Sequence, residues 1–116
     1  MSEVTIYHNP RCSKSRQTLA LLEERGIALN VVNYLETPPD AGTLKALLAM
    51  LKLDPRGLMR KKEAPFSELN LGDASLDDDE LVAAMIAYPI LIERPIVVVG
   101  DRAAIGRPPE DVLNIL

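Results

Sequence analysis

The first quarter of the chain has a strand pattern of apolar positions, then a turn, then a helical pattern. Residues 4–7 predict a short strand, and residues 8–11 break it because asparagine and proline favour turns. A helix is then expected to begin near Cys12 or Ser13, a suitable N-cap, and to end at Gly26, where a C-cap glycine is expected. The helix therefore starts directly after the turn.

Strand patterns return after this helix and again in the last third of the chain. Residues 29–34 are rich in Val and Leu and predict a strand parallel to the first, because a β-α-β order favours a crossover helix. Residues 96–99 predict a buried strand, and residues 102–106 predict its antiparallel partner across a two-residue turn at 100–101. A short terminal helix is expected over residues 111–116.

The segment between these strand-bearing parts has helical spacing. Thr37 is expected to cap a helix with Pro38 at its first position, and the leucines of residues 44–51 lie on one face of it. A second Asp-Pro start signal predicts a short helix from Asp54 to about Arg60.

A third helix in this segment has a clear start and a clear end. Asp77 and Glu80 fit a capping box, and Pro89 ends the helix. One face of this helix is expected to belong to the core: Leu81, Ala84, Met85 and Tyr88.

The order of elements is β-α-β, three helices, then β-β-α. This order predicts an α/β, thioredoxin-like (glutaredoxin-like) fold with a mixed four-stranded sheet. A helical insertion, at about residues 38–88, separates the β-α-β half from the β-β-α half. A chain of 116 residues is expected to form a single domain, residues 1–116.

Composition and charge exclude several classes of protein. The net charge of −4 and the small aromatic content (three Tyr, one Phe, no Trp) argue against a nucleic-acid binder. No apolar run reaches membrane-spanning length, since the longest, residues 81–92, is broken by Pro89. The N-terminus lacks the basic and long apolar regions of a signal peptide. We therefore expect a cytoplasmic protein, bound to no membrane, whose lone thiol stays reduced.

Cys12 is the candidate for chemistry because it falls at a helix start. Free N–H groups and the positive end of the helix dipole stabilise an anion there, so the thiol is expected to have a lowered pKa. Ser15, one turn on, is expected to donate a hydrogen bond to the thiolate. Four nearby side chains can add positive charge: His8, Arg11, Lys14 and Arg16. The alternative is a buried, structural cysteine.

The sequence around Cys12 also limits the kind of reaction. Residues 12–15 form a C-x-x-S motif, and the chain has no second cysteine, so redox chemistry needs an outside thiol: glutathione or a protein dithiol. Thr18 stands where a C-x5-R phosphatase loop needs arginine. One cysteine and one histidine exclude a Cys/His zinc site, and no metal is expected.

Five separated segments give the chain a specific resemblance. These are residues 6–16, 34–39, 58–61, 89–98 and 106–108. Residues 6–16, Ile-Tyr-His-Asn-Pro-Arg-Cys-Ser-Lys-Ser-Arg, resemble the active-site segment of the glutaredoxin-dependent arsenate reductases. Together the segments cover almost the whole chain.

The resemblance implies an arsenate reductase that works by covalent chemistry. Cys12 matches the family's nucleophile, whose thiolate attacks arsenic(V) in arsenate and forms a thio-arsenate adduct. Glutathione, a co-substrate and not a bound cofactor, then attacks, and glutaredoxin resolves the mixed species to release arsenite.

The resemblance also assigns roles to residues far from Cys12 in the sequence. Three arginines match the family's oxyanion-binding set: Arg60, Arg94 and Arg107. His8 and Ser15 match positions that tune the thiolate. Pro95 matches a proline whose preceding peptide bond is cis and which faces the reactive cysteine.

Two other functions fit the same fold. One is a glutathione-dependent thiol oxidoreductase acting on another substrate, and the residues Ser13-Lys14-Ser15 differ from the Gly-Thr-Ser of some family members. The other is a non-enzymatic regulator that binds RNA polymerase. The retained arginines favour an oxyanion substrate, and the C-x-x-S motif favours an enzyme over those regulators, which resemble C-x-x-C redox sensors.

Overall fold

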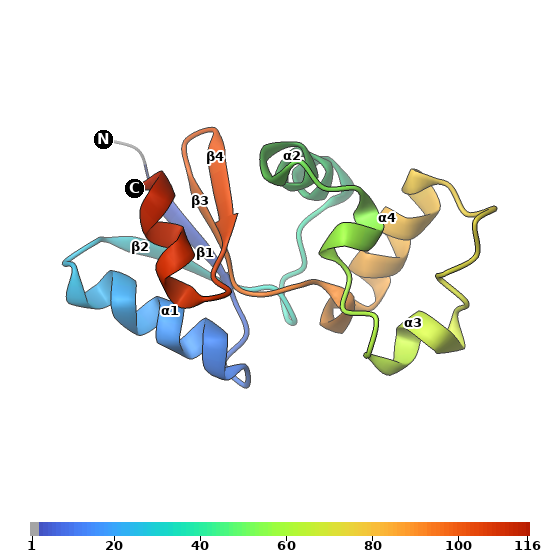
Figure 1. Ribbon diagram of the computed structural model, residues 1–116, viewed down its shortest axis with the longest axis horizontal. Helices are drawn as coiled ribbons and strands as arrows, with labels where there is room; N and C mark the ends of the chain where they lie inside the picture. The colour runs from blue at the N-terminus through green and yellow to red at the C-terminus, as the bar shows by residue number, and fades with distance from the viewer. Residues whose placement is uncertain (1–2) are drawn as a thin grey trace. The chain divides into compact units, whose positions relative to one another are not determined.

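The computed structural model describes residues 3–116 and divides the chain into two compact units. Unit 1 comprises Met1–Thr37 and Arg94–Leu116, and unit 2 comprises Pro38–Glu93 (Figure 1). Unit 2 matches the predicted helical insertion and extends it by five residues beyond residue 88. The single domain over residues 1–116 stays a prediction. The N-terminal segment was predicted to hold no signal peptide, and its residues 1–2 lie outside the described residues.

Unit 1 is built on a four-stranded mixed sheet in the order β2-β1-β3-β4. The strands are β1 (Val4–His8), β2 (Leu29–Asn33), β3 (Ile96–Val99) and β4 (Arg102–Ile105). β1 pairs with β2 in parallel, whereas the β1–β3 and β3–β4 pairs are antiparallel. The predicted sheet and both predicted pairings are therefore confirmed. β1 runs one residue further than predicted because His8 still pairs with Asn33 of β2.

Two helical elements pack on one face of this sheet: α1 (Ser13–Glu24) and η3 (Pro109–Ile115), a 3-10 helix. They meet the strands in one core cluster: Val4, Ile6, Leu22, Val97 and Val112. Gly26 follows the end of α1 with φ of 70°, so its predicted place after the helix is confirmed. The terminal helix begins two residues earlier than predicted, because proline at the first position needs no N–H partner.

Unit 2 is helical. Its elements are α2 (Ala41–Leu51), η1 (Pro55–Leu58), α3 (Ala64–Glu68), α4 (Asp78–Ala87) and η2 (Pro89–Leu91). Apolar residues of α2 and α4 are buried as predicted: Leu44, Leu47, Leu48, Leu81 and Met85. The Asp77–Glu80 capping box is present at the start of α4.

Four details of unit 2 differ from the sequence prediction. The N-cap of α2 is Asp40, whose carboxylate accepts the N–H of Thr43, and not Thr37. The short helix after Asp54 ends at Leu58 and is a 3-10 helix. Tyr88 is 44% exposed and does not belong to the core, because its backbone has left the helix before Pro89. The fourth detail is that two short elements, α3 and η2, were not predicted; none of the residues of α3 is buried.

Within residues 3–116, no helix is both long and apolar enough to cross a membrane.

Gly106 lets the loop after β4 lie against α1. A Cβ placed there would be 2.5 Å from Thr18 Oγ1 and 2.8 Å from Pro95 Cγ, both closer than side chains tolerate. Thr18 is fully buried, and its hydroxyl is held by donation to the Lys14 carbonyl. The lack of a side chain at position 106 therefore sets how closely this loop approaches the first turns of the helix.

We expect Gly106→Ala to lower the free energy of unfolding by about 1–3 kcal/mol, because the added methyl group overpacks this contact. Urea unfolding followed by circular dichroism measures the change. Gly42→Ala is the matched control, since the nearest atom to its Cβ is Asp40 Oδ1 at an ordinary 3.6 Å. The control should be as stable as the wild type or more stable. A Gly106→Ala protein with the wild-type midpoint would contradict the packing argument.

Candidate active site around Cys12

The sheet register brings three loops to one end of unit 1. Near the end of β1, Tyr7 lies opposite Ile96, the first residue of β3. Ile96 in turn lies opposite Ile105, the last residue of β4. The loop before Cys12, the residues before β3 and the residues after β4 therefore leave the sheet at the same end. Cys12, Arg94 and Arg107, which are remote in sequence, come together because of this register.

Cys12 is the N-cap of α1 and is partly exposed. Its backbone is extended (φ −93°, ψ 124°), and Ser13 is the first residue of the helix, so the predicted helix start near Cys12 or Ser13 is confirmed, with Cys12 as the N-cap. The N–H of Cys12 donates to the Asn9 carbonyl at 3.0 Å, and its own carbonyl accepts the N–H of Arg16 at 3.0 Å. These two hydrogen bonds hold the backbone of Cys12 through both its N–H and its carbonyl.

The pKa of the Cys12 thiol is lowered from its ordinary value. Burial by itself raises this pKa, but four groups that favour the thiolate outweigh it. In order of effect they are the backbone N–H of Ser15, the Arg94 side chain, the backbone N–H of Lys14 and the charge of Arg107. Helix N–H groups and two guanidinium groups thus hold a negative sulfur.

Arg107 and Arg94 form a linked pair beside this sulfur. Arg107 Nη2 donates to Cys12 Sγ at 3.3 Å, while its Nε donates to the Arg94 carbonyl at 2.9 Å. Arg94 is 7% exposed, which is unusual for arginine. The Arg94–Pro95 peptide is cis, as the resemblance implies, and the Arg107–Pro108 peptide is also cis, which was not predicted.

His8 and Ser15 contact each other near the start of α1, and Ser15 favours the Cys12 thiolate through its backbone N–H. His8 Nδ1 lies 2.7 Å from Ser15 Oγ, and the N–H of Asn9 also donates to that oxygen, at 3.0 Å. Ser15 therefore faces the sulfur with its backbone N–H, and its hydroxyl serves His8 and Asn9. The predicted support of the thiolate by Ser15 therefore comes from its backbone N–H.

The charge state of His8 also differs from the prediction that it adds a positive charge. Burial and, to a smaller extent, the charge of Arg16 lower its pKa, and Glu23 opposes them only in part. A histidine with a pKa below its ordinary ~6.5 is mostly neutral at pH 7. The positive charge near Cys12 in unit 1 therefore comes from arginine and lysine side chains.

Arg60 lies in unit 2 and is held by two carboxylates there. Its Nη1 donates to Glu93 Oε1 at 2.9 Å, and its Nε donates to Glu63 Oε2 at 3.3 Å. The backbone N–H of Arg60 donates to the Leu91 carbonyl at 2.7 Å. These contacts order the guanidinium within unit 2. Its convergence with Arg94 and Arg107 stays a prediction.

Sequence reasoning missed two residues that shape this site. Asn9, 2% exposed, organises the loop before Cys12, and Gly106 allows the close approach described above. An asparagine followed by proline at the end of a strand is a turn signal, but it does not show that the side chain is buried. The contact at Gly106 joins positions distant in sequence, so no local sequence pattern predicts it.

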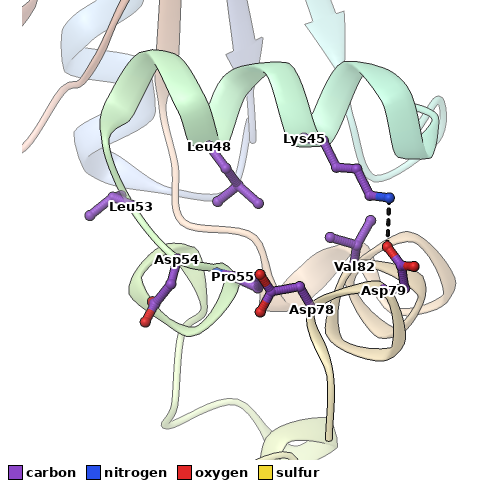
Figure 2. Close-up of a pocket in the computed structure, with 8 residues that line it drawn as sticks. All are labelled: Lys45, Leu48, Leu53, Asp54, Pro55, Asp78, Asp79 and Val82. Atoms are coloured by element: carbon purple, nitrogen blue, oxygen red, sulfur yellow. Dashed lines mark ion pairs between the residues drawn. The ribbon is translucent and has the colours of Figure 1, made fainter.

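A hollow of about 350 Å³ lies in unit 2 between α2 and the start of α4 (Figure 2). Lys45 and Asp79 form an ion pair in its wall. The remaining lining is apolar or acidic: Leu48, Leu53, Asp54, Pro55, Asp78 and Val82. None of the predicted site residues lines it. In the part of the chain that the structure describes, no three His, Cys, Asp or Glu side chains gather as a metal site.

Comparisons with known proteins agree on a family. The ArsC family model matches residues 7–115. The chain is 51% identical over 117 residues to the arsenate reductase of Neisseria meningitidis serogroup B (strain MC58), with all of both chains covered. It is 57% identical to the uncharacterized protein YfgD of Escherichia coli K12, covering 98% of this chain and 97% of that protein.

A solved structure gives the same answer for the fold. The arsenate reductase from Vibrio cholerae superposes with a TM-score of 0.96 at 59% identity, covering 99% of this chain and 98% of that one. This likeness confirms the predicted thioredoxin-like α/β fold class.

The lowered thiol pKa predicts how the reactivity of Cys12 depends on pH. Cys12 should react with iodoacetamide faster than free cysteine at pH 7. The midpoint of its alkylation rate plotted against pH should lie below the ordinary cysteine pKa of ~8.5. Because Arg107 stabilises the thiolate and not the thiol, Arg107→Gln should raise the midpoint and slow alkylation by about threefold to tenfold at a pH below it. Arg102→Gln, an exposed arginine on β4, is the control and should match the wild type. A midpoint unchanged by Arg107→Gln would show that the guanidinium does not act on the sulfur.

Proposed function

Because the chain belongs to the ArsC family, we propose that it is an arsenate reductase in which the Cys12 thiolate attacks arsenate. The observation that carries this proposal is the donation from Arg107 Nη2 to Cys12 Sγ at 3.3 Å, with Arg94 on the same sulfur. In this proposal Cys12 is the nucleophile, and the two arginines beside its sulfur bind the oxyanion. Reducing conditions, as in the cytoplasm, keep the lone thiol ready.

The first step joins sulfur to arsenic. The thiolate displaces a protonated oxygen of arsenate, which leaves as water, and arsenic stays at oxidation state five in the thio-arsenate adduct. Glutathione then attacks the adduct, and glutaredoxin resolves the mixed species and releases arsenite. The two electrons that reduce arsenic come from two thiols, which end joined in a disulfide. At least one of these thiols comes from outside the chain, because it has a single cysteine.

Electrostatics explains why arginines surround the sulfur. Two negative charges about 4 Å apart repel each other by about 4 kcal/mol at an effective dielectric constant near 20. Uncompensated, this repulsion slows attack by about 10³. Guanidinium groups hold the oxygens of a tetrahedral anion bidentately and offset the repulsion. In the proposal Arg94 and Arg107 do this in unit 1, and Arg60 is the third member of the set.

We expect Cys12→Ser to abolish arsenate-dependent NADPH oxidation in an assay coupled through glutathione, glutaredoxin and glutathione reductase, because a serine hydroxyl is not ionised near pH 7. Wild-type protein without glutaredoxin is the control and should also be inactive. Activity retained by Cys12→Ser rejects the nucleophile. A wild-type protein that reduces 2-hydroxyethyl disulfide but not arsenate points instead to a glutathione-dependent thiol oxidoreductase.

We expect Arg94→Lys to lower arsenate turnover at least about tenfold while the protein stays folded, because lysine keeps the charge but loses the two-pronged geometry. Arg102→Lys on β4 is the matched control. Steady-state rates of the coupled assay and the far-ultraviolet circular dichroism spectrum measure the two effects. Near-normal turnover in Arg94→Lys would remove Arg94 from the oxyanion site.

A further inference from the structure

Asn9 lies between β1 and α1 and uses every polar group it has. Its N–H donates to Ser15 Oγ at 3.0 Å, and its carbonyl accepts the N–H of Cys12 at 3.0 Å. Its side-chain Oδ1 accepts the N–H of Arg11 at 2.9 Å, and its Nδ2 lies 3.5 Å from the Tyr34 hydroxyl oxygen, which accepts from it. The residue is 2% exposed, so water does not compete for these bonds.

We propose that Asn9 is a positioning residue that holds Cys12 in the conformation in which its sulfur faces the first N–H groups of α1. The side-chain Oδ1 closes the turn over Arg11, and this turn carries the carbonyl that receives the Cys12 N–H. Without the amide, Arg11 and Tyr34 each lose one hydrogen-bond partner, and the turn loses the bond that sets its shape. The inference rests on the proposed function only in taking Cys12 as the reactive group.

The backbone N–H groups of Ser15 and Lys14 lower the thiol pKa, and this effect depends on the extended N-cap backbone of Cys12, which sets where the sulfur lies relative to them. A looser turn lets Cys12 sample other backbone angles and removes these donors for part of the time. Arg16 Nη1 also braces the loop, by donating to the Pro10 carbonyl at 2.9 Å, but that bond is exposed to water and is correspondingly weak. The buried amide of Asn9 is the stronger of the two constraints.

The rate of Cys12 alkylation by iodoacetamide as a function of pH tests this role without arsenate. Asn9→Ala should raise the midpoint of the profile and slow alkylation about tenfold at a pH below the midpoint, while the limiting rate at high pH stays near that of the wild type. Asn9→Ser keeps one oxygen acceptor for the Arg11 N–H and should give an intermediate midpoint.

Asn33→Ala is the matched control. Asn33 ends β2 as Asn9 follows β1, and its Oδ1 accepts the N–H of Leu35 at 3.2 Å in the same kind of turn. Its midpoint should equal that of the wild type even if urea unfolding shows a comparable loss of stability in both alanine variants. A wild-type midpoint in folded Asn9→Ala overturns the proposal.

If Asn9→Ala fails to fold, Asn9→Ser decides alone: a raised midpoint supports the positioning role, and an unchanged one overturns it. Because the readout is alkylation of the thiol, an inactive wild type in the arsenate assay leaves this result interpretable.

Discussion

The partial charge at the start of α1 has to hold a negative sulfur against the cost of taking that sulfur out of water. Burial raises the thiol pKa of Cys12, and it is the largest single effect on it. Two backbone N–H groups and two arginines outweigh it together, and no one of them exceeds it alone. The site therefore depends on simultaneous placement of donors from α1, from the residue before Pro95 and from the loop after β4. The sheet register supplies that placement, because it brings the start of β3 and the end of β4 to the end of β1.

Close packing keeps these donors in place. The loop carrying Arg107 meets α1 at Gly106, where Thr18 and Pro95 leave no room for a side chain. The Arg107 guanidinium then bridges the sulfur and the Arg94 carbonyl, so one side chain links Cys12 to the segment that carries Arg94. The neutral state of His8 fits this picture, because a buried imidazolium beside Ser15 would have to be desolvated as well. His8 orders the first turn of the helix through the Ser15 hydroxyl and leaves the charge of the site to arginine.

Local sequence signals predicted the elements but not the contacts between them. The Asn-Pro turn and the helical pattern after it located Cys12 at a helix start, and the capping box located α4 within one residue. The short α3 was not predicted because none of its residues is buried. Asp40, and not the predicted Thr37, caps α2 because its carboxylate reaches the N–H of Thr43. Arg107 and Cys12 are 95 positions apart in the sequence, so only the family resemblance suggested that they lie close together. The burial of Asn9 likewise depends on Tyr34 from another loop, and no spacing rule encodes it.

A single cysteine imposes a compromise on such a site. The sulfur has to be shielded enough for N–H groups and arginines to act strongly on it, since water weakens both interactions. In the proposed reaction it also has to stay open, because the chain has no second cysteine and an outside thiol has to reach the sulfur. Cys12 meets both demands with a partly exposed side chain beside an almost buried Arg94. Rigid backbone serves this compromise better than deeper burial does. In the proposed function, donors placed by α1 and the sheet register hold the thiolate, with Asn9 as the proposed positioning residue, and the partly exposed sulfur is where arsenate and later the incoming thiol approach.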